Sequence, residues 1–583
     1  MTTGRASARL RAAAPHLLGL LLPLLVLGPA LGRGVVLSYD LAWSPDPRWT
    51  PVALGLSTPA PRAVPSDAVG ILLGHVVGAG PAQALLLWGV LVLAATGAVR
   101  LSRLLRADLP WWAACAVVVA AVWNPFVLER LVVGQWTALL GYAVVPHLLV
   151  LARRVRVGEA RGSAGLMAAV ACSGVGGANS LVLAVLAVGP VLLLPRPAWR
   201  PLAGVVAAAL GVAGAWAVPA LVASPPSSAV GAAAFAPRPD TPLGTVLSLV
   251  AGGGFWNPAT HPAERGSVLL AGVALVVVVL SLGTAARALA RLDGLRLLAP
   301  AALGLALAVL AVLDPAGLWT GIVTSVPGGG VLRDAQKLVA PLVVLAASGV
   351  GVLVAGLRRP GGAAARVGGG ALATVVALVP VLTLPSLAWG VGGRLTAVEV
   401  PADLRAAATL LSAAPEGGVG LLPWSQYRRY AWNGNRVSLS LVPRMVDQRV
   451  LADDALPLRS GRVPGEDPAA ARVGRALAAG VDPLVALRRE GVRYVLVERR
   501  VAPPAPDVVP PAGSRVLADT ADALVLDLTP GAAPVQRVTP VASVVGWALT
   551  ALTLLAALGV LARTGIRAAR RLPEEHRGSV TRW

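Results

Sequence analysis

The chain has 583 residues, of which 56% are hydrophobic and only 13% are charged. A soluble domain has about 25% charged residues, so this composition excludes an ordinary soluble protein. The formal net charge is +22, but the basic residues are scattered between apolar runs, which argues against a nucleic-acid partner. Cys115 and Cys172 both fall inside apolar runs, so neither a disulfide framework nor a CxxC metal site is expected.

Apolar runs long enough to cross about 30 Å of hydrocarbon recur along the chain and predict a multi-pass membrane protein. The first run, 17–31, could alternatively belong to a signal peptide cleaved at Ala30-Leu31-Gly32. The uncharged stretch 164–195 would be about 48 Å long as one helix, and its centre GVGGANS favours a turn, so we expect two short spans there. The remaining spans, which bring the total to twelve, are expected at 82–99, 111–127, 131–151, 201–223, 268–285, 297–313, 337–357, 367–389 and 541–562.

The distribution of basic residues gives the predicted orientation. With both termini in the cytoplasm, the inner loops and the C-terminal tail hold 24 basic residues, whereas the outer loops other than the large domain hold 8. This asymmetry follows the positive-inside rule. We therefore expect a protein of the plasma (inner) membrane with both termini cytoplasmic and residues 391–540 extracytoplasmic.

Residues 391–540 are the only long stretch outside the apolar runs, and their pattern predicts a small α/β domain. Helix-then-strand signals occur twice, and a strand pair closes the segment. The expected elements are helix 403–411, strand 417–423, helix 482–490, strand 492–497 and strands 516–518 and 523–528. The predicted fold is therefore an all-α membrane domain of about twelve transmembrane helices with this α/β domain. Its other parts are a transmembrane domain 1–390 with outer loops 33–80, 224–267 and 314–336, a last transmembrane helix 541–562 and a basic cytoplasmic tail 563–583.

The acidic residues favour chemistry at the outer surface. None of the 28 lies in the middle of a predicted span, and eight lie in outer loops. Ion-coupled carriers usually keep ionisable groups at mid-membrane depth. The pattern therefore favours an outer active site over a coupled transport pathway, although an uncoupled exporter needs no buried acid.

The first outer loop contains the candidate catalytic residues. Asp40 lies close to Trp43, and a carboxylate beside an aromatic ring suits a sugar whose hydroxyl loses a proton to it. The alternative is a solvated acid beside interfacial tryptophans. Asp67 is the second candidate base, after Arg62, a candidate substrate-binding residue, and Ser66, which is expected only to start a short surface helix.

Two later outer loops carry candidate substrate-binding residues. Trp256 and His261 could contact a sugar, and no second histidine lies at metal-ligand spacing, so no zinc site is expected. No metal or cofactor is indicated, and a requirement for a divalent metal stays open. Arg333 and Lys337, the only lysine, are four residues apart and would share a helical face, which suits a lipid phosphate. The alternative is that both side chains reach to lipid headgroups.

Two further segments have alternative interpretations. The segment 123–136 is expected to form an outer turn that Glu129 and Arg130 help to close, although Arg130 could instead hold a phosphate. LLPWSQYRRYAWNGNR, in the α/β domain, is rich in aromatic and basic residues. It could bind carbohydrate or pack as a loop against the membrane face.

Four segments, WNPFVLERLVVGQW, PRAVPSD, VLRDAQK and GVRYVLVE, resemble those of actinobacterial multi-span proteins. These proteins are related to arabinofuranosyltransferases and other glycosyltransferases of the GT-C class. The resemblance implies a GT-C-like fold, a catalytic aspartate in the first outer loop at the position of Asp40, a polyprenyl-phosphate sugar as donor, and an extracytoplasmic C-terminal domain. The loop lacks the adjacent acidic pair of many members.

The expected function is that of a membrane glycosyltransferase in cell wall biogenesis. It would move a sugar from a polyprenyl-phosphate donor to an envelope glycan or lipid acceptor on the extracytoplasmic side. Its partners would be these substrates and membrane lipids, with no nucleic acid. The alternatives are an exporter or flippase of a lipid-linked glycan and a non-catalytic protein of envelope assembly.

Overall fold

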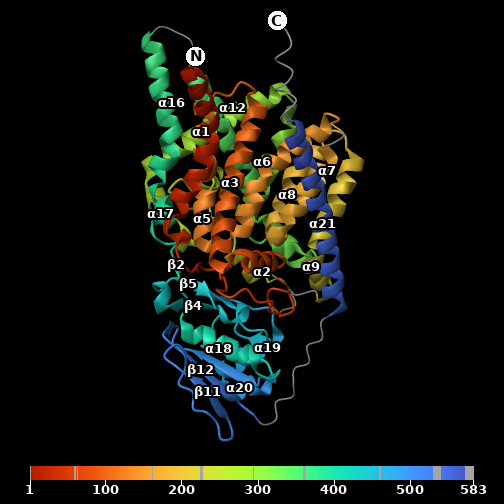
Figure 1. The fold of residues 1–583 in the computed structure, drawn as a ribbon, viewed down its shortest axis with the longest axis vertical. Helices are drawn as coiled ribbons and strands as arrows, with labels where there is room; N and C mark the ends of the chain where they lie inside the picture. The colour runs from red at the N-terminus through yellow and green to blue at the C-terminus, as the bar shows by residue number, and fades with distance from the viewer. Residues whose placement is uncertain are drawn as a thin grey trace.

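The computed structural model describes residues 2–57, 61, 63–159, 162–223, 228–292, 294–358, 363–458, 461–529 and 540–571. Long helices form a bundle, and an α/β unit lies at one end of the long axis of the molecule (Figure 1). We call the end of the bundle next to this unit the domain end. Helix α1 begins, and helix α21 finishes, at the opposite end of the bundle, the far end.

Among the described residues, ten helical segments are long and apolar enough to cross a membrane, and the bent pair Ala299–Leu313 with Pro315–Ser325 is an eleventh candidate. The protein is therefore a multi-pass membrane protein, and the predicted fold class is confirmed. The bundle consists of α1 (Thr2–Leu27), α3 (Ala79–Leu105), α4 (Trp111–Val122), α5 (Pro125–Val133), α6 (Trp136–Arg156), α7 (Gly162–Ser173), α8 (Gly177–Leu193), α9 (Trp199–Ala223), α12 (Val268–Leu292), α13 (Ala299–Leu313), α15 (Ala340–Leu357), α16 (Ala363–Thr383) and α21 (Val541–Arg571). Shorter helices in the connections are α2 (Ser66–Val77), α10 (Ala229–Ala234), α11 (Thr245–Val250), α14 (Leu318–Ser325) and α17 (Ala388–Gly392).

The segment Gly162–Leu193 turns back on itself, although by length it counts as one apolar stretch of 32 residues. It begins shortly after α6 ends, and the chain beyond it returns to the same place, where Arg156 Nη1 donates to Arg196 O at 2.7 Å. Between α7 and α8, the turn Gly174–Gly176 lies at the other end of α6, against the backbone of Thr137. The two short spans expected here are present, and counting both of them raises the eleven candidates to twelve crossings.

The predicted outer turn at 123–136 is wrong in position. Helices α4 and α5 form one crossing that is broken at Asn124, whose side-chain oxygen caps α5. The chain reverses only at Gly134, which has a φ of +79°. Glu129 and Arg130 do not close a turn, because they lie inside α5 and each is 1% exposed. Glu129 lies four residues before the domain end of this crossing, so it does not contradict the prediction that no acid lies in the middle of a span.

Helix α21 packs tightly against α9. A Cβ atom placed on Gly546 would lie 2.3 Å from Gly214 O, whereas one placed on Gly559, in the same helix, would meet nothing within 4 Å. The contact is reinforced by a hydrogen bond from Ala215 N to Thr550 Oγ1 at 2.9 Å.

We expect Gly546→Ala to lower the midpoint of thermal unfolding in detergent. The two backbones would have to separate, and overpacking of this kind costs about 1–3 kcal/mol. Gly559→Ala is the matched control, and it should leave the midpoint unchanged or raise it because alanine favours the helix. Equal midpoints for the two variants would contradict the observed packing.

The α/β unit is built on a five-stranded sheet with the strand order β11-β12-β9-β3-β6. Strand β3 (Val419–Leu422) is parallel to both of its neighbours, β9 and β6, while β12 is antiparallel to β9 and β11. All five residues of β9 are buried, which explains why its sequence YVLVE is apolar without alternation. The other elements are β6 (Val450–Leu451), β9 (Tyr494–Glu498), β11 (Arg515–Asp519), β12 (Ala523–Asp527), α18 (Ala402–Ala413), α19 (Pro468–Ala478) and α20 (Pro483–Arg489).

The helices and strands predicted for this unit are confirmed, but α19 and two small sheets were not predicted. One of these sheets has the order β10-β4-β5 and consists of β4 (Tyr427–Tyr430), β5 (Val437–Leu439) and β10 (Val501–Ala502). Strands β4 and β5 come from the segment LLPWSQYRRYAWNGNR and the residues that follow it, and Tyr427 and Asn433 of this segment contact the first loop. The other pairs β7 (Leu456–Leu458) with β8 (Gly461–Val463).

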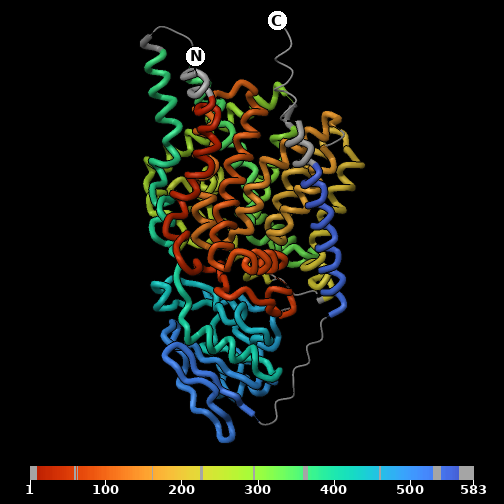
Figure 2. The backbone as a smooth tube through the Cα atoms, viewed as in Figure 1, coloured from red at the N-terminus to blue at the C-terminus, as the bar shows by residue number. Residues whose placement is uncertain are grey.

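The described residues of the first loop, 32–57, 61 and 63–65, lie between the bundle and the α/β unit (Figure 2). Strand β1 (Val35–Val36) pairs with β2 (Ala397–Val398). Tyr39 then lies beside β5, donating from its N to Val437 O at 2.6 Å and accepting at its O from Leu439 N at 2.9 Å. Backbone hydrogen bonds thus attach the loop to the α/β unit.

Candidate active site

Helix α5 connects three features of the domain end. Pro125, in its first turn, lines an apolar cavity. Glu129 and Arg130 are buried one turn further along, and O of Val133, the last residue, accepts a hydrogen bond from Asp40 N at 3.0 Å. With a rise of 1.5 Å per residue, these features lie within about 12 Å along the helix axis.

Asp40 is half-buried, and its carboxylate is held from two sides. Oδ1 accepts a hydrogen bond from Tyr427 Oη at 2.8 Å, and Oδ2 accepts one from Gln135 Nε2 at 3.3 Å. The approach of the loop requires a glycine at 134, because a Cβ there would lie 2.4 Å from Leu41 N. A carboxylate held in a fixed orientation is a candidate general base.

Arg130 is fully buried between two aromatic rings. Its guanidinium carbon lies 4.6 Å from the centroid of the Phe126 ring and 4.4 Å from that of Phe255. Among the described residues, none accepts a hydrogen bond from any of its three side-chain nitrogens, and Glu129 Oε2 is 4.0 Å from Nη1. A guanidinium presents five N–H donors in a planar fork that matches phosphate oxygens. Arg130 is therefore a candidate phosphate ligand.

A second buried ion pair adjoins this cluster. Arg265 donates to Asp240 at 2.5 and 3.1 Å, and both side chains are almost fully buried. Burial alone would raise the pKa of Asp240, but the ion pair and hydrogen bonds with Arg265 outweigh it and hold the pKa below its usual value. The charges of both residues act on Glu129, so α5 is linked to the loop that contains Asp240.

Lys337 belongs to the same region but has its own partners. Its ammonium is buried and donates to Asn179 Oδ1 at 2.6 Å and to Val331 O. The charge of Asp334 acts on both Lys337 and Arg130. The shared α-helical face predicted for Arg333 and Lys337 is wrong, because the segment is a 3₁₀-helix that begins at Ala335, after Arg333.

All three phenylalanines of the chain lie against an arginine of this region. Phe126 and Phe255 enclose Arg130, and Phe235 lies 4.4 Å from the guanidinium carbon of Arg333. Two residues predicted to bind substrate, Trp256 and His261, contact these phenylalanines.

Trp256 packs edge-on against Phe235, with 4.6 Å between the ring centroids, and its ring centroid lies 5.5 Å from that of Phe255. A ring nitrogen of His261, Nε2, makes a hydrogen bond of 2.7 Å with the backbone oxygen of Phe255. Trp256, His261 and Arg333 are thus brought together, and their contact with a sugar or phosphate stays a prediction.

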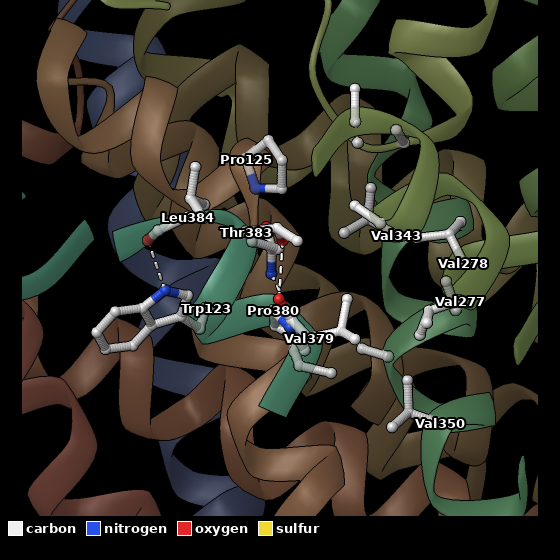
Figure 3. A pocket seen from close by; sticks show the side chains of 18 of the residues that line it. Trp123, Pro125, Val277, Val278, Val343, Val350, Val379, Pro380, Thr383 and Leu384 are labelled. Atoms are coloured by element: carbon white, nitrogen blue, oxygen red, sulfur yellow. Dashed lines mark hydrogen bonds between the residues drawn. The ribbon is translucent and has the colours of Figure 1, made fainter. Parts of the chain in front are cut away.

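The apolar cavity lies among the spanning helices (Figure 3). Val277 of α12, Val343 of α15 and Val379 of α16 line it, and its volume is about 80 Å³. Trp123 closes one side with a hydrogen bond from Nε1 to Leu384 O at 2.8 Å. The only charged residue among the described residues that line it is Arg265. A cavity of this kind suits an alkyl chain whose polar end points toward Arg265.

Asp67 faces a separate cavity of about 30 Å³, whose lining includes Trp43 but not Asp40. Asp67 lies in the first turn of α2 and pairs with Arg444 of the α/β unit at 2.9 Å. Trp43 donates from Nε1 to Ala79 O at 3.0 Å. The cavity has room for water. The structure therefore does not bring the two candidate bases together, and Arg62 lies outside the described residues.

Asp67 should give the protein a pH-dependent stability. Burial raises the pKa of its carboxyl above the usual value, although Arg444 acts in the opposite direction. The folded state then binds the proton more tightly than the unfolded state, so the free energy of unfolding falls as pH rises from about 4 through the raised pKa. We expect the thermal midpoint to fall over this window, and to fall less in Asp67→Asn. An identical slope in the variant would contradict this assignment.

Comparison with known proteins gives a fold relationship. No protein-family model and no curated protein matches the chain. The chain superposes on the cryo-EM structure of arabinofuranosyltransferase AftD from Mycobacteria with a TM-score of 0.58 and 16% identity, over 90% of this chain and 40% of that one. A mutant form of AftD gives a TM-score of 0.54 and 17% identity, over 90% of this chain and 42% of that one.

The chain shares its fold with AftD. The resemblance to arabinofuranosyltransferase-like membrane proteins, inferred from the sequence, is thus confirmed at the level of the fold. The chain spans less than half the length of AftD, so the relationship covers the membrane bundle and the adjoining α/β unit without the rest of that protein.

Proposed function

We propose that the protein is a membrane glycosyltransferase of the GT-C type. It moves a sugar from a polyprenyl-phosphate donor to an envelope glycan or lipid acceptor on the extracytoplasmic side of the plasma membrane. The observation that carries the proposal is the spacing along α5. The Asp40 loop meets Val133 only three residues after Arg130, whose buried guanidinium donates no hydrogen bond to any described residue. A base and an anion site within one helical turn suit a sugar phosphate between them.

The proposed reaction is a single displacement. Asp40 accepts the proton of the acceptor hydroxyl, and that oxygen attacks the anomeric carbon from the face opposite the phosphate. The bond between the anomeric carbon and the phosphate oxygen breaks, and the lipid phosphate leaves as an anion held by Arg130. Phosphate is a good leaving group, so one base is sufficient, and the configuration at the anomeric carbon is inverted.

The apolar cavity and the distribution of charge support the donor and the orientation. The alkyl chain would occupy the cavity beside α5, with Arg265 toward its polar end. Asp40 is at the domain end, while the arginines in the last turns of α3 and α6 are at the far end with the start of α1. The positive-inside rule then supports a cytoplasmic far end and an extracytoplasmic domain end.

The proposal is tested with the full-length protein reconstituted in vesicles. The probe is radiolabelled polyprenyl-phosphate arabinofuranose, since the name of the fold neighbour gives this sugar, together with a short arabinan acceptor. We expect labelled acceptor and free polyprenyl phosphate. Movement of the intact donor across the bilayer, without a new glycosidic bond, would instead identify an exporter. If neither transfer nor movement is detected, the proposal is overturned and a role in envelope assembly is left.

A further inference from the structure

The α/β unit reaches the proposed base through strand β4. The hydroxyl of Tyr427, the first residue of β4, donates to Asp40 Oδ1 at 2.8 Å. These two residues are 387 positions apart in the sequence. On the other side of the carboxylate, Gln135 Nε2 is 3.3 Å from Oδ2, so the bond from Tyr427 is the shorter of the two.

Buried ionic contacts fix β4 from its other face. Side chains alternate along a strand, so Arg428 and Tyr430 point away from the side on which Tyr427 lies. Both bind Glu498, which is 1% exposed and ends β9. Arg428 donates from Nε to Oε2 of Glu498, and Tyr430 donates from Oη to Oε1 at 2.7 Å. Arg428 also donates to Pro423 O at 2.8 Å.

The backbone of the loop is aligned on the same small sheet. Tyr39 forms a bridge with Ser438 of β5, the strand that pairs with β4. Its φ is +43°, an uncommon value for a residue other than glycine, which turns the chain so that Asp40 follows directly toward Tyr427. Asn433 adds a hydrogen bond to Leu37 O at 3.3 Å. The α/β unit therefore holds both the backbone and the carboxylate of this loop from the side opposite Val133 and Gln135.

We propose that Tyr427 is a positioning residue for the Asp40 carboxylate, so that the α/β unit completes the active site of the membrane domain. This inference rests on the proposed function. The hydrogen bond from the Tyr427 hydroxyl fixes Oδ1. The plane of the carboxylate is thereby held in one orientation, with Oδ2 directed toward Gln135 and α5. Glu498 acts one step further away, because it holds the strand that carries Tyr427.

The test is Tyr427→Phe in the full-length protein in vesicles, with the arabinofuranose donor and arabinan acceptor named above. We expect kcat to fall about tenfold or more, because one hydrogen bond to a charged group is lost. The KM for the donor and the thermal midpoint should stay at their wild-type values, since the ring and its packing remain. A purely structural role would lower the midpoint together with kcat.

Tyr494→Phe is the matched control. It makes the same chemical change in the same unit, and among the described residues the Tyr494 hydroxyl has no hydrogen-bond partner. We expect wild-type kcat from this variant. Because Tyr427 acts through Asp40, the double variant Tyr427→Phe with Asp40→Asn should be no slower than Asp40→Asn alone.

The outcomes separate this inference from the proposed function. Wild-type kcat in Tyr427→Phe, with an inactive Asp40→Asn, would overturn the positioning role and leave the base in place. A loss of kcat accompanied by an equal loss in Tyr494→Phe, or by a lower midpoint, would also overturn it. Wild-type transfer by Asp40→Asn would overturn the proposed base itself.

Discussion

Asp40→Asn should reduce sugar transfer by about 10²- to 10⁴-fold, the usual contribution of a general base. The amide keeps the size of the side chain and can still accept the hydrogen bond from Tyr427, but it cannot take a proton from the acceptor hydroxyl. The decrease is therefore expected in kcat, with the donor bound as before. The measurement is transfer of label from the donor to arabinan in vesicles.

Asp46→Asn is the matched control for this variant. Asp46 lies in the same loop and forms a partly exposed ion pair with Arg405 at 2.6 Å. Pairs of this kind contribute about 0–1 kcal/mol. The control should fold and transfer at close to the wild-type rate. Equal activity of the two variants, whether both high or both low, would show that Asp40 has no special role in the loop.

Arg130→Met should lower kcat/KM for the donor by about a hundredfold or more, because two charge-assisted hydrogen bonds to the phosphate would be lost. Its effect on folding should be smaller than that of Arg428→Met, because Glu129 Oε2 is 4.0 Å from Arg130 Nη1 and accepts no hydrogen bond from it. Methionine can fill the space between Phe126 and Phe255 with favourable contacts of its sulfur. It also removes a buried charge that makes no hydrogen bond with the described residues.

Arg428→Met provides the contrast. Arg428 is also fully buried, but it is hydrogen-bonded to Glu498, Pro423 O and Ser425 O. Its loss should cost about 3–5 kcal/mol of stability, because the charge of Glu498 would be left without its partner. The checks are thermal midpoints and donor kinetics measured side by side. If Arg130→Met is as unstable as Arg428→Met and keeps the wild-type KM for the donor, then Arg130 has a structural role.

The spanning helices could be predicted because the bilayer sets their length and polarity along the sequence. The glycine-rich centre of 164–195 correctly indicated a hairpin. The sequence places the turn after α5 too early, because the apolar run at 131–133 resembles the start of the next span. Gly134 was the only local signal for a turn, and its importance comes from the contact with Leu41, about ninety residues earlier in the chain.

The site could be predicted only where its signals are local. The tryptophans in the same loop indicate Asp40 as a candidate. Its partners Gln135 and Tyr427, however, are 95 and 387 residues away from it in the sequence. No periodicity or spacing rule relates such positions. Arg130 did have a local signal, since Phe126 precedes it by four residues and a helix places both on one face. Recognition of that signal required α5 to be assigned as a helix instead of a turn.

The hydrogen bonds between the first loop and the α/β unit have a consequence for biosynthesis. Asp40 is translated among the first few dozen residues, whereas Val437, Ser438 and Tyr427 emerge only after almost all of the membrane helices. A nascent chain would thus hold all but the last spanning helix before Asp40 is set in place. Under the proposed function, catalytic competence would then arrive late, after synthesis of the α/β unit, and a prematurely terminated product would remain inert.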